Sequence, residues 1–220
     1  MNNNSLVSGL RCAVVMAAVG AVVVSQPVMA AAGDLVIRAG VSAMETDSGS
    51  DSFSAIPRSG VRLDNAVTLS ASAAYYLSDY AAVELTTSLP YQHNLEGNNR
   101  LKELGLGKLA EVKEIPTSLT MNFYLNDYSA VTPYVGVGVA YTRFYDEDMK
   151  VPGLAVDFED TVDLTAVAGV EMAFLNNLIV SFDLRYIDLK PTADFSGAVD
   201  ENIELEVDPV IFTLSAGYRF

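Results

Sequence analysis

Beyond Gly33, the sequence alternates between apolar and polar positions with a period of two. From Val67 to Leu77 the odd positions are apolar or aromatic, whereas most even positions are threonine, serine or alanine. This alternation predicts a β-strand with one apolar face and one polar face. The same pattern defines eight segments: Leu35–Met44, Val67–Leu77, Ala81–Gln92, Pro116–Leu125, Pro133–Tyr145, Val162–Phe174, Leu178–Leu189 and Val207–Phe220.

The connections between these segments alternate in length. Short polar turns fall at Ser78–Tyr80, Asn126–Thr132 and Asn176–Asn177, and longer acidic or glycine-containing loops fall at 46–65, 93–115, 147–161 and 191–206. Several of the segments reach the roughly 9–11 residues that a tilted membrane-spanning strand needs. The sequence therefore predicts an all-β fold, an eight-stranded antiparallel transmembrane β-barrel. In such a barrel both termini lie with the short turns, on the periplasmic side.

A soluble barrel with its apolar face inward is the alternative to a membrane barrel. The polar face consists of small residues with scattered charges, as at Gly136, Gly138 and Thr142. A solvated face would carry many more Lys, Glu and Asp residues, whereas small polar residues fit the narrow interior of eight strands. Aromatic residues near strand ends also resemble the interfacial girdles of membrane barrels: Tyr75, Tyr91, Phe123, Tyr141, Tyr186 and Tyr218. These features favour the membrane barrel.

The first 30 residues have the pattern of a secretory signal peptide. Arg11 precedes the apolar run Cys12–Val24, and small residues follow up to Ala30, near which we expect cleavage. The barrel domain would then comprise residues 31–220. Removing residues 1–30 removes one of 13 basic residues and none of the 28 acidic ones, which changes the net charge from −15 to −16. This charge argues against binding nucleic acid.

The barrel domain offers little for catalysis or metal binding. Its only histidine is His93, and the only cysteine of the sequence, Cys12, lies in the predicted signal peptide. Thiolate and multi-histidine metal sites are therefore excluded, and we expect no metal, no cofactor and no catalytic residues. An outer-membrane enzyme is the least favoured reading.

Charged residues on the polar face form the first candidate cluster in the lumen. Three arginines and three acidic residues point inward: Arg38, Glu84, Glu171, Asp183, Arg185 and Arg219. Because an unpaired buried charge is costly, we expect them to pair. The resulting network would fill the lumen. An ion-selective filter is the alternative, but eight strands leave little free bore.

The same inward parity, continued toward the long loops, gives apolar residues: Met44, Phe144, Ile187, Leu189 and Ile211. A lumen that is apolar above and charged below suits a small apolar ligand that comes from outside and does not pass straight through. A packed plug beneath the loops is the equal alternative.

Two pairs of prolines flank long loops, Pro90 with Pro116 and Pro191 with Pro209. Proline cannot donate a ladder hydrogen bond, so we expect both hairpins to lose pairing there. The four prolines are thus candidates for a lateral opening from the lumen into the bilayer. Their alternative role is to end the strands above the membrane.

Several stretches resemble the OmpW family of small outer-membrane barrels. They are "IRAGVS", "LPYQHNL", "IPTSLTMNFYL", "TPYVGVGVAYTRFYD" and "VDPVIFTLSAGYRF", which occur in order along the whole barrel domain. The resemblance implies a hydrophobic channel that opens to the outside of a Gram-negative cell, with passive uptake of small hydrophobic molecules and lateral exit. Its partners would be membrane lipid, lipopolysaccharide and, through the strand ending at Phe220, the outer-membrane barrel-assembly machinery.

The sequence departs from that family at the constriction of the channel. As aligned, the apolar constriction falls at Thr86 and Arg185, which are polar and inward-facing here. With Asp183 on the same face and Glu171 on the neighbouring strand, we expect ion pairs to close the channel floor. The alternative function is a structural or surface-interaction barrel that displays its acidic loops without transport.

Overall fold

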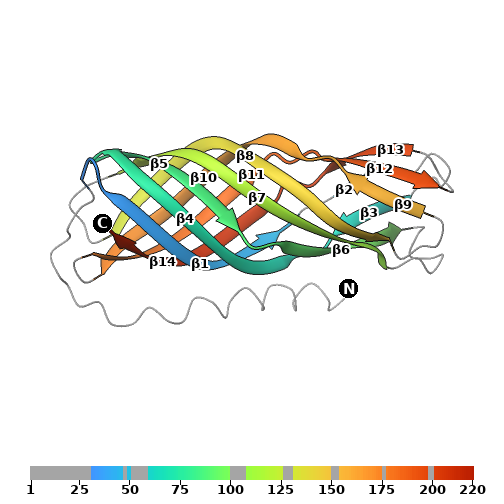
Figure 1. Cartoon of the computed structure of the whole chain (residues 1–220), viewed down its shortest axis with the longest axis horizontal. Helices are drawn as coiled ribbons and strands as arrows, with labels where there is room; N and C mark the ends of the chain where they lie inside the picture. Colours follow the sequence, from blue (N-terminus) through green and yellow to red (C-terminus); the bar gives the residue numbers. More distant parts are fainter. Residues whose placement is uncertain are drawn as a thin grey trace, which may run out of the picture.

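The computed structural model describes residues 31–46, 49–50, 59–99, 108–125, 131–149, 154–174, 177–197 and 201–220. The predicted signal peptide, residues 1–30, lies outside these ranges. The described chain is built from β-strands, most of which wind around one elongated barrel (Figure 1). No helix among the described residues has the length and apolar character needed to cross a membrane.

Eight strands form the barrel, as the alternation predicts. In their order around the wall they are β1 (Leu35–Glu45), β4 (Ala66–Ser78), β5 (Ala81–Ser88), β7 (Lys108–Tyr124), β8 (Val131–Met149), β10 (Thr161–Phe174), β11 (Leu178–Ile187) and β14 (Val210–Arg219). Each pairs antiparallel with the next, and β14 pairs with β1 from Val36↔Arg219 to Glu45↔Val210. Phe220 N–H donates to the Leu35 carbonyl at 2.9 Å, which closes the ring at the chain end.

The two faces of the wall differ as expected for a barrel in lipid. Outward side chains are large, apolar and exposed, as at Leu69, Val137 and Leu164. Inward side chains are small or polar and buried, as at Ser42 and Thr120. Gly138 has no room for a side chain, because a Cβ there would lie 2.0 Å from the Leu119 carbonyl oxygen. The backbones of β7 and β8 therefore approach closely only with glycine at this position.

Both described chain ends, at Ala31 and Phe220, lie at the end of the barrel that holds the short turns (Figure 1). We call this the turn end and the opposite end the loop end. Beyond the loop end, a second sheet has the strand order β2 (Gly49–Ser50), β13 (Glu201–Glu206), β12 (Thr192–Gly197) and β9 (Leu154–Phe158). Two further strands, β3 (Ser59–Leu63) and β6 (Tyr91–Asn99), extend the barrel sheet.

The segments predicted as long loops are thus largely strands, which corrects the prediction. β7 begins at Lys108, so Pro116 lies inside this strand and not at its start. The prediction failed because these strands are short, as β9 is, or carry polar residues on both sides of their alternation, as β6 does. Such a strand is stable when its backbone groups pair with a neighbouring strand, here β7 with β6 and β8.

Candidate functional site

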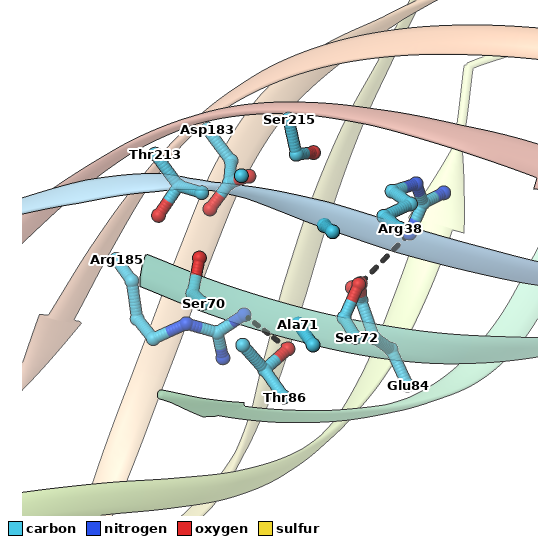
Figure 2. Close-up of a pocket in the computed structure, with 12 residues that line it drawn as sticks. Arg38, Ser70, Ala71, Ser72, Glu84, Thr86, Asp183, Arg185, Thr213 and Ser215 are labelled. Atoms are coloured by element: carbon cyan, nitrogen blue, oxygen red, sulfur yellow. Dashed lines mark hydrogen bonds and ion pairs between the residues drawn. The ribbon is translucent and has the colours of Figure 1, made fainter. Parts of the chain in front are cut away.

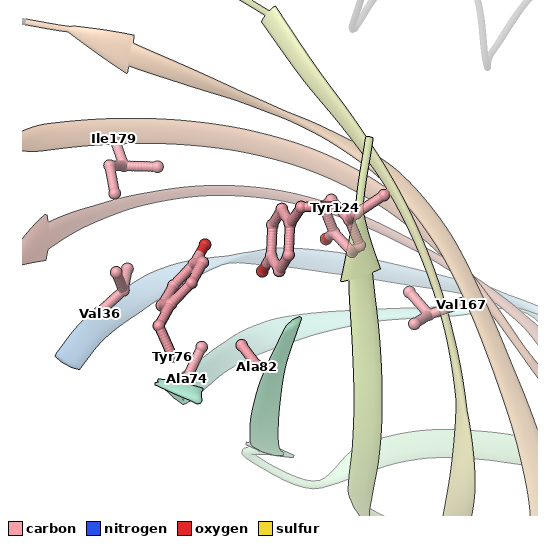
Figure 3. Packing of buried hydrophobic residues seen from close by; sticks show 8 residues of the cluster. Val36, Ala74, Tyr76, Ala82, Tyr124, Val167 and Ile179 are labelled. Carbon is pink, nitrogen blue, oxygen red and sulfur yellow. The ribbon is translucent and has the colours of Figure 1, made fainter. Parts of the chain in front are cut away.

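The lumen is filled at the turn end by three tyrosines, which we call the tyrosine floor. Tyr124 lies between Tyr76 and Tyr134, with ring centroids 5.0 and 5.1 Å away. Val36 and Ile179 pack in the same buried cluster (Figure 3). Gly169 makes room for the floor, because a Cβ there would lie 2.6 Å from the Tyr134 ring. Alternation along the sequence does not reveal this floor, because each tyrosine comes from a different strand.

Arg38 lies directly above the tyrosine floor and is paired with two carboxylates. Its Nη1 donates to Glu84 at 2.7 Å, and its Nη2 donates to Glu171. Asn122 donates to the second oxygen of Glu84 at 2.6 Å. All four side chains are buried. The predicted pairing of lumen charges is therefore present in this layer, and it joins β1, β5, β7 and β10 across the lumen.

The second arginine of the lumen, Arg185, has different partners from those expected. Its guanidinium donates to the hydroxyl groups of Ser118 at 2.8 Å and Thr86 at 3.2 Å. Glu171, expected beside Arg185, contacts Arg38 instead. Inward parity gave the correct face for these residues, but it does not give their height along tilted strands.

A small cavity of about 10 Å³ separates the two arginines (Figure 2). This is the room that roughly one water molecule needs. Its polar lining comes from Asp183, Glu84 and Thr86 together with serine and threonine hydroxyl groups. Arg219 lies lower, at the turn end, where its backbone N–H donates to the Asn177 carbonyl at 2.9 Å. The tyrosine floor and the arginine layers together close the turn-end half of the lumen.

The loop-end half of the lumen, which we call the apolar half, is lined by apolar residues from β1, β8, β11 and β14, whereas the buried Glu114 and His93 lie on the side of β6 and β7. All five residues predicted to line it are buried, with exposed fractions between 1 and 6%: Met44, Phe144, Ile187, Leu189 and Ile211. Phe144 also stacks on Phe158 of β9 with ring centroids 5.5 Å apart. Along β11 the described lumen thus changes from charged to apolar between Arg185 and Ile187. Whether the apolar half binds a ligand stays a prediction.

The barrel wall is interrupted beside Pro90. β5 pairs with β7 from Ala81↔Phe123 to Thr86↔Ser118, and pairing resumes on β6 with Tyr91↔Glu114. Four residues, 87–90, therefore oppose three, 115–117, and the register slips by one. Neither Pro90 nor Pro116 has an N–H to donate across this interval. The hydroxyl groups of Thr87 and Thr117 meet there at 3.0 Å. We call this interval the Pro90 break.

The slip reverses the faces of the chain beyond Pro90. Leu85 and Leu89 face outward, yet Tyr91 and His93 are both buried, with exposed fractions of 1%. The prediction that Tyr91 belongs to an outer aromatic girdle is therefore wrong. An inserted residue moves every later side chain to the other face, and simple alternation cannot foresee it.

The second proline pair leaves the register intact. Tyr186 pairs with Val210, Ile187 N–H donates to the Pro209 carbonyl at 3.2 Å, and Val207 N–H donates to the Leu189 carbonyl at 3.1 Å. Pairing then continues in the same register between β12 and β13. Pro191 and Pro209 are both buried. Of the two predicted sites of lost pairing, only the Pro90 break slips the register.

Comparison with known proteins agrees with this architecture. The family model described as "OmpW family" matches residues 31–220. Outer membrane protein W of Salmonella typhi is 30% identical, over 86% of this chain and 89% of its own length. Outer membrane protein AlkL of Ectopseudomonas oleovorans is 31% identical, over 76% of this chain and 71% of its own length.

A solved structure shows the same fold. The crystal structure of the outer membrane protein OprG from Pseudomonas aeruginosa superposes with a TM-score of 0.79 and 27% identity. The match covers 86% of this chain and 97% of that one. The barrel is thus an outer-membrane protein of Gram-negative bacteria, embedded in the lipid bilayer. The chain belongs to the OmpW family.

Proposed function

We propose that this barrel takes up small hydrophobic molecules passively. In this proposal the loop end faces outside, and the molecule enters the apolar half of the lumen beside Ile187 and Phe144. It then leaves sideways through the Pro90 break into the bilayer. The observation that carries the proposal is this break in the wall above a closed floor.

The route is supported by the polarity of its surroundings. Three leucines expose their side chains outward around the break, Leu69, Leu89 and Leu119, with exposed fractions of 56, 58 and 48%. Thr87 and Arg143 are also exposed there, toward the middle and the loop end of the break. Below the apolar half, a hydrophobic molecule would meet the guanidinium of Arg185 and displace its hydroxyl partners. Because such a molecule has no polar group to replace them, the buried charge would lose its hydrogen bonds. Lateral exit is therefore favourable where straight passage is not.

The test joins the two sides of the break covalently. Thr87→Cys with Thr117→Cys replaces two hydroxyl groups that lie 3.0 Å apart, a separation that a disulfide can span. The only native cysteine is Cys12, in the predicted signal peptide, so the pair has no competing thiol in the barrel domain. In cells that lack their own copy, we expect oxidation to reduce uptake of an apolar naphthylamine fluorophore at least tenfold and dithiothreitol to restore it.

A matched control joins the opposite side of the barrel. Ser181→Cys with Ser215→Cys links β11 to β14, whose hydroxyl groups lie 2.7 Å apart, and should leave uptake unchanged. Heat-dependent gel mobility checks that equal amounts of folded barrel are present. Equal uptake by the oxidised and reduced Thr87/Thr117 variant would overturn lateral exit through the Pro90 break.

A surface-interaction barrel is the second candidate function. The four-stranded sheet of β2, β13, β12 and β9 stands beyond the barrel and carries acidic residues such as Glu204 and Glu206. Such a protein would be indifferent to the Thr87/Thr117 disulfide and sensitive to deletion of this sheet. We further propose that lipopolysaccharide surrounds the loop end, and that the assembly machinery recognises the strand ending at Phe220.

A further inference from the structure

His93 lies just above the Pro90 break and contacts chain segments on both sides of β6. Its Nδ1 is 2.6 Å from the backbone carbonyl of Asp64, in the connection between β3 and β4. Its Nε2 is 3.3 Å from a carboxylate oxygen of Glu114 on β7. The imidazole therefore spans from one neighbour of β6 to the other, where the ladder below has been lost.

Asp64 is fixed in place by hydrogen bonds that do not involve His93. The Asp64 carboxylate accepts the Asn94 backbone N–H and the Asn94 side-chain amide, each at 2.6 Å. The Glu114 side depends on His93. Glu114 is 1% exposed, and apart from its contact with His93 neither carboxylate oxygen accepts a hydrogen bond from the part of the chain that the structure describes. An isolated buried carboxylate is costly, so the contact with His93 carries most of its compensation.

The geometry of His93 requires a proton between the two side chains. A carbonyl oxygen only accepts, so Nδ1 must carry a hydrogen to bond with Asp64. In a neutral imidazole with that hydrogen, Nε2 is an acceptor and would face an acceptor oxygen of Glu114. The contact is favourable only when one proton lies on Nε2 or on the Glu114 carboxyl group.

We propose that His93 and Glu114 form a proton-dependent brace between β6 and β7 at the upper edge of the Pro90 break, and that loss of their proton loosens the first pairs of β6 with β7 and widens the lateral exit. The effect of the brace on uptake rests on the proposed function, whereas the proton-dependent contact between His93 and Glu114 does not. It makes His93 a positioning residue that acts on the width of the exit.

The pH range follows from the surroundings of His93. Its outward neighbours Gln92 and Lys113 are polar, which places His93 beyond the apolar band of the wall. Burial lowers the pKa of His93, but the hydrogen bond and charge of Glu114, and then Asp64, outweigh it and raise the pKa above its ordinary value. Tyr91 stacks on His93 with ring centroids 6.3 Å apart. Burial raises the pKa of the Tyr91 hydroxyl group to about 12, and the charges of Glu114, Arg185 and Asp183 also act on that pKa.

The direction of the effect follows from this raised pKa. The brace is fully present below the ordinary histidine pKa of about 6.5, and it is lost as the pH rises through the higher value in the folded protein. Uptake should therefore increase with pH, and the contribution of the brace to stability should decrease.

The first measurement is an NMR titration of the imidazole in the purified barrel in lipid. His93 is the only histidine in the sequence, so its signals need no assignment. We expect a pKa above about 6.5 in the wild type and a lower pKa in Glu114→Gln, which removes the charge and keeps the shape. An unchanged pKa in Glu114→Gln would overturn the brace.

The second measurement follows amide exchange of β6 and uptake of the naphthylamine fluorophore from pH 6 to pH 9. In the wild type we expect both to rise severalfold through the pKa of His93, beyond the intrinsic pH effect on exchange. In Glu114→Gln both should be nearly independent of pH, with Asp146→Asn, at an exposed contact of Lys113, as the control. Uptake that is present but unaffected by titration of His93 contradicts the brace and leaves the uptake function standing. No uptake by folded wild type contradicts the function, and exchange of β6 then decides the brace alone.

Discussion

The two sides of the barrel that carry proline pairs differ although their sequences look alike. At the Pro90 break, four residues of one strand oppose three of the next and the register slips by one. Between β11 and β14, Pro191 and Pro209 stand in an unbroken register that continues into β12 and β13. Proline removes a donor in both places, but only the unequal residue count displaces the strands. An opening therefore needs the slip, which the prolines alone do not produce.

The largest expected effect concerns Arg38 and its two carboxylates above the tyrosine floor, which connect the two sides of the barrel. Arg38→Ala would leave Glu84 and Glu171 buried without their counter-charge, which costs about 3–5 kcal/mol. We expect this loss in the free energy of unfolding by urea in lipid vesicles. Both sides of the barrel should be affected equally, because Arg38 joins strands across the lumen.

Arg143→Ala is the control for this change, since Arg143 is exposed on the outer face of β8. A surface substitution of this kind should stay within about 0.5 kcal/mol of the wild type. If Arg38→Ala lowers the free energy of unfolding by less than about 1 kcal/mol, the carboxylates find other partners. The ion pairs of Arg38 would then not stabilise the two sides of the barrel together.

A smaller effect should appear in the amide exchange of the two sides. The amide of Ser88, which lies beyond the last pair of β5 with β7, should exchange at least about tenfold faster than those of Ile187 and Val207, whose N–H groups are bonded across the second pair. Hydrogen exchange followed by NMR at neutral pH measures this ratio. Equal protection at the two sides would remove the structural difference on which lateral exit depends.

The smallest effect is expected from the prolines themselves. Pro209→Ala restores an N–H where the register is already continuous, so we expect a change in unfolding free energy below about 1 kcal/mol and unchanged uptake. Pro90→Ala should also leave the slip in place, because the residue count is unaltered. Uptake lost in Pro90→Ala would show that the missing donor, and not the slip, sets the width of the exit.

Much of the architecture was readable from alternation alone. The eight strands, their closure and the inward set from Arg38 to Ile211 follow from period two, because each face of a strand has one kind of neighbour. The partners of the charged lumen residues do not follow from alternation, since Glu171 contacts Arg38 and not Arg185. Parity fixes a face, but the stagger of tilted strands decides which layer a side chain joins.

The residues beside the break were the hardest to place. Pro90 and Pro116 indicate missing backbone N–H donors, yet nothing in the local sequence gives the number of residues on the facing strand. For that reason alternation places Tyr91 on the outside and does not predict the contact of His93 with Glu114. Glu114 lay in a segment predicted as loop, and its burial depends on the strand pairing that extends β7 down to Lys108.

The pairing of the last strand with the first has a consequence for the order of events during biogenesis. Between Val36 and Arg219 nearly the whole barrel domain must be present before the final ladder can form. Contacts so distant in sequence form slowly, because the chain must first close a large loop. Until Phe220 is available, β1 and β11 both expose unpaired edges, which are prone to aggregate. The chain must therefore be kept apart from its copies until its synthesis is complete.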